Sequence, residues 1–286
     1  MPARRVFRIT NNRVRLGVGL VLVGLFCIQC THPDAERDAE VIAGVSGQTA
    51  GKVSTDRQKE LEALARTDHV ALLTQAIDHY RASYQDYTCT FMKAERIDGR
   101  QRPEQEIRVK FREKPFSVAM AWVRNTPMGD RVLYIEGHND GNMLVRPTSG
   151  LLRALAGKAV SRRPDGPQAM ANTLRPVTMF GFHRVMKNMV KVYAEAARRK
   201  EGTSEFLGYK ELGGRQVMVL RRVLPARKDY PAKTTTWYLD LEHLVPLGLE
   251  ASDWDDRPIC RYLYVDVRFN VGLTDKDFSL EANEMK

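Results

Sequence analysis

Hydrophobic and polar residues alternate with a period of two over much of the chain after residue 86. In VKFREKPFSVAMAW, residues 109–122, the large side chains of Phe116, Val118, Met120 and Trp122 alternate with serine and alanine. Such alternation is typical of β-strands that bury one face. About ten segments follow the pattern, in two runs of five: residues 87–97, 104–113, 116–124, 131–137 and 141–147, then 204–212, 215–224, 233–241, 245–254 and 259–270.

A helical spacing of three to four residues precedes the first run and separates the two. Apolar residues at this spacing predict helix from residue 55 to about Ser83, with a break near Arg66 if Thr67 caps a second helix. The spacing returns from about Thr178 to Lys200. Between the runs, residues 147–177 are irregular and contain a short helix candidate at 150–160. Hairpin-linked strands with few helices indicate an α+β fold with an antiparallel sheet.

The N-terminus has the pattern of an export signal. Five arginines without any acidic residue precede the apolar run at Leu16–Ile28, which is too short for a usual transmembrane helix. Residues 1–30 are therefore predicted to be a signal peptide or a short N-terminal anchor. Residues 31–54 have the composition of a flexible tether, and 55–286 are expected to form a single domain. The protein is expected to be exported to the periplasm or cell envelope.

The net charge of +10 does not indicate a nucleic-acid partner. Half of the excess belongs to the five arginines of residues 1–30, and the remaining basic residues are scattered in pairs without a nucleic-acid-binding motif.

Two cysteines, Cys89 and Cys260, follow the leader. Export permits disulfides, so a bond between them and a pair of buried free thiols are both open alternatives. Neither cysteine has the spacing of a zinc ligand, and no pair of histidines does.

No catalytic site is predicted, and no metal or cofactor. The chain has no GxSxG elbow and no phosphate-binding loop. Its acidic cluster, Asp253, Asp255 and Asp256, lies in a predicted turn, where solvated and hydrogen-bonded carboxylates are common. A hydrolase based on these acids is the weakest of the three functional hypotheses.

Five motifs carry a family resemblance, which covers roughly Tyr87 to Phe278. The segments DYTCTFMKAERIDGR, VKFREKPFSVAMAW, LYIEGHNDGNMLVRP, PDGPQAM and YLYVDVRFNVGLTDKDF together resemble a family of bacterial exported proteins with a domain of unknown function. That family is in turn similar to the LolA/LolB lipoprotein carriers. The resemblance implies a strongly curved antiparallel sheet, an incomplete LolA-like half-barrel, with helices across its open side and an apolar cavity that accepts acyl chains.

The resemblance brings no catalytic residues. The residues before Cys27 and Cys30 depart from a lipoprotein cleavage motif, which disfavours a LolB-like anchored role.

The bulky strand residues and the methionines of the second helix are the candidate cavity lining. These positions are Phe116, Val118, Met120, Trp122, Met186, Met189, Trp237, Leu239, Leu263 and Val265. Methionine suits surfaces that accept varied apolar partners. The alternative is that all ten residues are ordinary core, because any half-buried strand alternates in this way.

The first hypothesis is a non-catalytic envelope protein that carries a lipid or the acyl chain of a lipoprotein. Its partners would be a lipid or an acylated protein, and a membrane surface. The alternative is a structural or interaction module with a packed core.

Overall fold

The computed structural model describes residues 55–148 and 159–286. The predicted leader and tether lie outside the described residues. So does most of the short helix predicted at 150–160, whose last residue, Val160, begins a strand. Among the residues described, no helix is long and apolar enough to cross a membrane.

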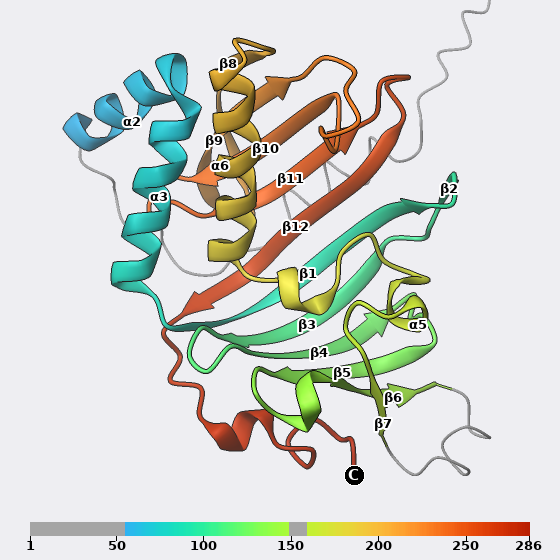
Figure 1. The fold of residues 1–286 in the computed structure, drawn as a ribbon. Coiled ribbons are helices and arrows are strands. Elements are labelled where there is room, and N and C mark those ends of the chain that lie inside the picture. The colour runs from blue at the N-terminus through green and yellow to red at the C-terminus, as the bar shows by residue number, and fades with distance from the viewer. Residues whose placement is uncertain (1–54, 149–158) are drawn as a thin grey trace, which may run out of the picture.

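One antiparallel sheet of twelve strands forms the body of the protein (Figure 1). The strand order is β7-β6-β5-β4-β3-β1-β12-β11-β10-β9-β8, and β2 pairs with β1 alone. The strands are β1 (Asp86–Ile97), β2 (Arg100–Gln101), β3 (Gln105–Arg112), β4 (Ser117–Arg124), β5 (Gly129–Ile135), β6 (Met143–Pro147), β7 (Val160–Arg162), β8 (Thr203–Leu212), β9 (Arg215–Val223), β10 (Thr234–Asp240), β11 (Pro246–Ser252) and β12 (Pro258–Phe269).

The two predicted runs of strands meet where β1 pairs with β12. Phe91 of β1 lies opposite Tyr264 of β12 on one side and opposite Ile107 of β3 on the other. The ten predicted strands are present, and β2 and β7 are two short additions. Strand β2 forms because Asp98 and Gly99 both adopt positive φ, the requirement of a tight two-residue hairpin turn.

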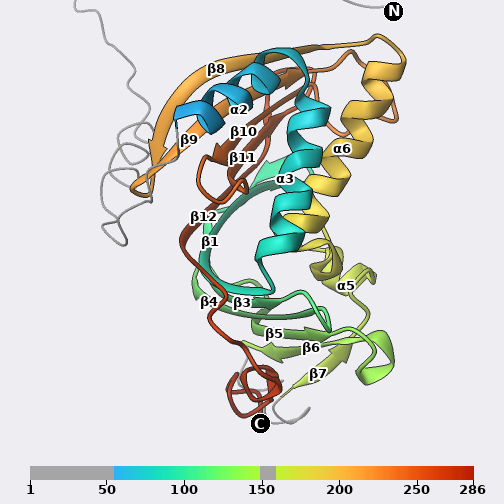
Figure 2. The same cartoon turned by 90° about the vertical axis from the view of Figure 1, so that its left-hand side faces the viewer.

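The sheet is strongly bent and open. Its end strands, β7 and β8, do not pair with each other. Figure 2 shows the sheet curving around the helices, which lie on its concave side. The predicted α+β fold, an open and curved antiparallel sheet with helices across it, is thus confirmed.

The helical stretch at 55–83 is broken into α2 (Thr55–Thr67) and α3 (His69–Ser83), with the break one residue beyond the predicted cap, Thr67. Asp68, not Thr67, caps α3: its Oδ1 accepts hydrogen bonds from the backbone N–H groups of Val70 and Ala71, both at 2.9 Å. The Thr67 hydroxyl instead donates to the carbonyl oxygen of Ala63 within α2, at 2.7 Å. Asp68 is the cap because its carboxylate accepts hydrogen bonds from two backbone N–H groups at the start of α3.

Helix α6 (Phe182–Arg198) packs against α3 and fills the concave face near β1 and β12. Its first residue, Phe182, is fully buried and packs edge-on or tilted against the rings of Tyr80, Tyr87 and Tyr264. The helix starts this close to the sheet because Gly181 precedes it. Gly181 has φ +102°, and a Cβ there would lie 2.6 Å from the ring of Phe111.

The C-terminal segment, residues 271–286, covers the part of the convex face formed by β4 and β5. Phe278, in the short 3-10 helix η3 (Asp275–Phe278), and Met285 are buried against Ala119 of β4 and Leu133 of β5. Ala119, one of the small residues in the alternating stretch 109–122, therefore leaves room for this segment, while its neighbours Val118 and Met120 face the concave side.

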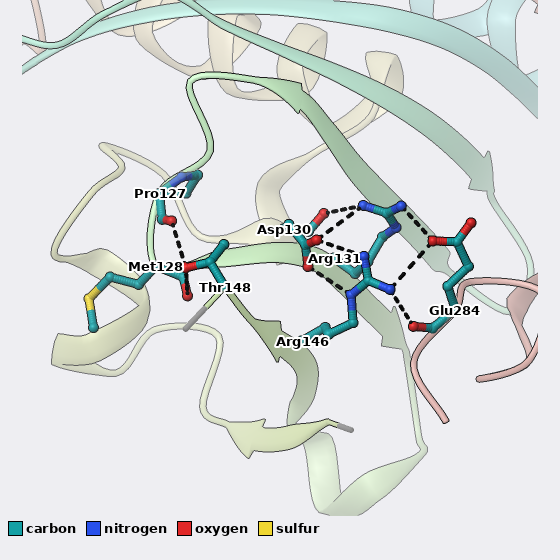
Figure 3. A network of polar contacts seen from close by, with 7 residues as sticks. All are labelled: Pro127, Met128, Asp130, Arg131, Arg146, Thr148 and Glu284. Carbon is teal, nitrogen blue, oxygen red and sulfur yellow. Dashed lines mark hydrogen bonds and ion pairs between the residues drawn. The ribbon is translucent and has the colours of Figure 1, made fainter. Parts of the chain in front are cut away.

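A charged clamp fixes the end of the C-terminal segment (Figure 3). Arg146 makes a bidentate contact with Asp130, at 2.6 and 2.8 Å, and donates to the Glu284 carbonyl oxygen at 2.7 Å. Arg131 donates to the Glu284 carboxylate, also at 2.7 Å. The adjacent Asp130 carboxylate raises the pKa of Arg146.

Candidate functional site

A cavity of about 560 Å³ lies on the concave side, beside the packed helices rather than beneath them. Its roof is the segment 163–180, which follows strand β7 and contains the short helix α5 (Pro167–Met170) and the 3-10 helix η2 (Val177–Met179). Figure 2 shows α5 below α6, facing the half of the sheet that ends in β7. We call segment 163–180 the cover segment.

The floor of the cavity is a row of apolar residues that crosses the sheet. Val109, Met120, Val132, Val145 and Val160 lie opposite one another in succession on β3 to β7, and the last four line the cavity. The row is continuous because the pairing register keeps residues of the same parity on one face. Phe91, Trp122, Met143 and Phe180 extend the apolar wall.

Exposed lining residues mark the mouth. Met128, in the loop before β5, is 70% exposed, and Gln168 and Ala171 of the cover segment are also exposed. The mouth therefore lies between the β4–β5 loop and the cover segment.

One end of the cavity is polar. Lys93 and Glu95 on β1 form an ion pair of 3.2 Å, and their side chains are only 10% and 3% exposed. Tyr262 of β12 donates its hydroxyl to Glu95 at 2.5 Å. Because burying an unpaired charge is costly, each of the two side chains can stay charged in this buried place only while the other compensates it.

The same ion pair ties the cover segment to the sheet. Lys93 donates to the Thr173 hydroxyl at 3.2 Å, and the Leu174 backbone N–H donates to Glu95 at 3.3 Å. The cover segment is thus held over the cavity by buried polar contacts as well as by apolar packing.

Arg175 is the next residue of the cover segment and also lines the cavity. Its guanidinium carbon lies 5.7 Å from the centre of the Tyr262 ring, a cation–π contact. Burial raises the pKa of Cys260 to about 11, and burial also raises the pKa of Tyr262; nearby Arg175 opposes both shifts. Both groups are therefore protonated at neutral pH.

The structure places two of the ten predicted lining residues, Met120 and Trp122, at the cavity. Seven others, namely Phe116, Val118, Met186, Met189, Trp237, Leu239 and Leu263, are buried in the main hydrophobic cluster and do not line it. Val265 lines a separate cavity of about 60 Å³. Trp237 and Leu239 belong to the core because α3 and α6 pack on that part of the concave face. Leu263 has the parity opposite to the cavity-lining Tyr262 and Tyr264, and is buried on the other face of the sheet.

The sequence reasoning missed the polar end and the cover segment. A signal for the polar end was present: Lys93 and Glu95 continue the parity of Cys89 and Phe91, the buried face of the same strand. Charged residues at core-facing positions of a strand indicate a pair or a site. The cover segment has no periodicity, so its place over the sheet could not be predicted.

Cys89 and Cys260 are free, buried thiols, so the disulfide alternative is wrong. The register explains why. Glu95 of β1 lies opposite Cys260 of β12, which puts Cys89 six residues further along its strand, about 20 Å away at the usual rise. A disulfide requires Cα atoms within about 7 Å.

The acidic turn has a structural role. Asp253 accepts hydrogen bonds from the backbone N–H groups of Asp255 and Arg257, at 3.0 and 2.9 Å, and forms an ion pair with Arg96. Asp256 pairs with Lys233 at 2.6 Å. These contacts hold the pKa of Asp253 below its usual range against the opposing effect of burial. The carboxylates are engaged in closing the turn rather than converging on a cleft.

Comparisons with solved structures find similar folds at low identity. A DUF1329 family protein from Desulfovibrio piger is 14% identical, covering 77% of this chain and all of that one, with a TM-score of 0.38. The MucA/MucB complex of Pseudomonas aeruginosa is 11% identical over 75% of this chain and 62% of that chain, with a TM-score of 0.44. A LolA superfamily protein from Nitrosomonas europaea is 9% identical over 74% of this chain and 98% of that chain, with a TM-score of 0.31. Nothing about the function of this chain follows from scores in this range.

A comparison with curated proteins finds no match. A family model does match, over residues 84–286, from the end of α3 to the C-terminal residue. The chain belongs to the DUF1571 family of proteins of unknown function.

Proposed function

We propose that this protein binds a lipid, or the acyl chain of a lipoprotein, in the cavity beneath the cover segment, without covalent chemistry. The observation that carries the proposal is an apolar cavity of about 560 Å³ next to a densely packed core. Its volume falls in the range of small-molecule sites, and is nearly four times the roughly 150 Å³ that admits benzene.

Because the cavity has an open mouth, its apolar lining is in contact with water when no ligand is bound, which is unfavourable. An acyl chain removes this surface, and its own, from water, and each buried methylene contributes about 0.8 kcal/mol. Ten methylenes would give a gross gain of about 8 kcal/mol, before the loss of chain freedom on binding.

The proposed setting is the cell envelope. It rests on the basic, apolar N-terminus, which is the reason to expect export. In that setting the candidate partners are a membrane lipid or an acylated protein.

A second candidate is an interaction module that needs no ligand. The half of the concave face beneath α3 and α6 favours it, because Met186, Trp237 and Leu239 are fully buried there. This candidate predicts that the protein from envelope fractions is ligand-free and that the cavity has no affinity for acyl chains.

Native mass spectrometry of the full-length protein purified from envelope fractions, together with titration of a fluorescent fatty acid, tests the two candidates. The decisive variant is Ala169→Trp, which adds an indole to a cavity-lining position of the cover segment. Ala194→Trp makes the same change at an exposed position of α6 and is the matched control.

The carrier proposal predicts a bound lipid in the wild type and at least about tenfold weaker fatty-acid binding in Ala169→Trp, because displacing two methylenes already removes about 1.6 kcal/mol. Ala194→Trp should bind like the wild type. Wild-type protein that is consistently ligand-free and does not bind the fatty acid would support the interaction module instead.

A further inference from the structure

We infer that the ligand of this cavity is a single-chain amphiphile with an anionic headgroup, a carboxylate or a phosphate monoester, and that Arg175 is the residue that recognises the charge. The inference rests on the proposed function and adds to it the chemical class of the ligand and its orientation.

The charges that line the cavity are unbalanced. Of the residues that the structure describes, four charged side chains line it: Lys93, Arg162 and Arg175 are cationic, and Glu95 alone is anionic. Glu95 is already committed to Lys93 and accepts two further hydrogen bonds, from Tyr262 and the Leu174 N–H. No described residue of the cavity wall therefore compensates the charge of the two arginines.

Arg175 is the cation best placed to meet a headgroup. It is half-buried, and among residues 55–148 and 159–286 no carboxylate lies within ion-pair distance of its guanidinium. Its guanidinium lies over the ring of Tyr262, whose hydroxyl donates to Glu95, and so belongs to the polar end of the cavity. An arginine at this position offers a planar set of donors that matches a carboxylate or phosphate.

Arg162 has a different environment. It is exposed at the end of β7 and donates to the carbonyl oxygen of Ser161 at 2.8 Å. A solvated arginine contributes less to binding an anion than a half-buried one, because water screens the interaction. Arg175 is therefore the residue on which the headgroup preference should depend.

The polar and apolar parts of the cavity suit two parts of one molecule. Arg175 lies at the Tyr262 end, while Met120, Val132 and Val145 extend away across the sheet. A ligand with its anionic group at Arg175 and its tail on this row satisfies both. A free anion would leave the apolar row empty, and a neutral chain would leave the guanidinium without a partner.

The test compares three ligands of equal chain length, dodecanoate, dodecyl phosphate and dodecanol, and adds inorganic phosphate as a headgroup without a chain. Affinities are measured by calorimetry on the full-length protein. The variants are Arg175→Gln, which removes the charge, and Arg175→Lys, which keeps it. Arg163→Gln is the matched control, since Arg163 is exposed on the same segment, pairs with Asp165 and does not line the cavity.

We expect the wild type to bind dodecanoate or dodecyl phosphate about tenfold or more tightly than dodecanol. This is the ratio of affinities that one charge-assisted hydrogen bond provides. Arg175→Gln should lose this preference and retain dodecanol binding, which also shows that the variant is folded. Arg175→Lys should keep part of the preference, and Arg163→Gln all of it.

Equal binding of the three chain ligands, or an unchanged preference in Arg175→Gln, would overturn the headgroup assignment and leave the proposed function intact. Tight binding of inorganic phosphate alone would also overturn it, by identifying a free-anion site. If none of the chain ligands binds, the proposed function itself fails.

Discussion

At the scale of single residues, the most informative feature is the ion pair buried in a strand of otherwise apolar core positions. Lys93 and Glu95 form an ion pair of 3.2 Å on the face that also carries Phe91, and the Tyr262 hydroxyl donates a hydrogen bond to Glu95. Removing one partner of such a pair leaves the other charge buried without compensation, whereas removing both does not.

Glu95→Ala is accordingly expected to destabilise the protein by about 3–5 kcal/mol, and a Lys93→Met/Glu95→Leu double variant to recover most of that loss. Denaturant unfolding measures both. Glu106→Ala is the control, because Glu106 pairs with Arg124 at 3.8 Å on the surface and should change stability by no more than about 1 kcal/mol. Stability of Glu95→Ala within 1 kcal/mol of the wild type would contradict this account of the pair.

Strand parity predicted which side chains face inward, but it could not separate filled from hollow regions of the concave face. Met120 and Trp122 line the cavity, whereas Val118, on the same strand and the same face, is fully buried in the core. The difference arises from which element packs opposite each residue. That depends on α6 and the cover segment, which are more than 30 positions away in the sequence.

At the scale of elements, strand β4 separates two different packings. Its large residues face the helices and the cavity, and Ala119 on the other face is 4% exposed beneath Phe278 and Met285. A larger side chain at this position must displace the C-terminal segment, since overpacking typically costs about 1–3 kcal/mol.

Ala119→Leu should therefore lower the stability by about 1–3 kcal/mol and increase protease cleavage within residues 271–286. Unfolding and limited proteolysis report the two effects. Ala121→Leu makes the same change two residues further along the same face, outside the cluster with Phe278, and should have a smaller effect. Equal effects of the two substitutions would argue against the segment as the cause.

The joint between α2 and α3 makes stability depend on pH. His69 is 2% exposed, and its Nε2 lies 2.8 Å from the Ala65 carbonyl oxygen, to which it donates. Burial lowers the pKa of His69, nearby Arg222 lowers it further, and Asp68 and the Ala65 contact oppose the shift. The folded state therefore takes up a proton less readily than the unfolded chain.

Because the folded pKa is the lower one, the stability from neutral His69 is complete above about pH 6.5, the ordinary value of histidine, and is lost as the pH falls below it. His69→Gln, which keeps a donor for Ala65, should flatten the decline in unfolding free energy between pH 7 and 5. His138→Gln, at an exposed position, should leave the decline unchanged. A slope that His69→Gln does not alter would contradict the assignment.

At the scale of the whole molecule, the period of the sequence predicted the sheet well. Ten strands, the two runs of five and the helices predicted at 55–83 and about 178–200 appear where the pattern places them, because half-buried strands and amphipathic helices impose different periods. The sequence could not predict which part of the concave face is packed core beneath α3 and α6 and which part is cavity beneath the cover segment. The cover segment has no period of its own and is positioned by contacts such as those of Thr173 and Leu174 with the β1 ion pair.

The central claim is that the space beneath the cover segment holds an acyl chain, and Trp122 is a natural reporter of it. Trp122 lines the cavity, whereas Trp237 is fully buried in the core and Trp254 donates its indole N–H to the carbonyl oxygen of Leu224, away from the cavity. Bromine on an acyl chain quenches a tryptophan that it touches.

The most direct measurement is tryptophan fluorescence during titration with a fatty acid brominated in mid-chain, in the wild type, Trp122→Phe and Trp254→Phe. Our account predicts saturable quenching that persists in Trp254→Phe and is largely lost in Trp122→Phe. Saturable quenching that is unchanged in Trp122→Phe would place the chain elsewhere, and no quenching of the wild type at saturating ligand would contradict the account outright.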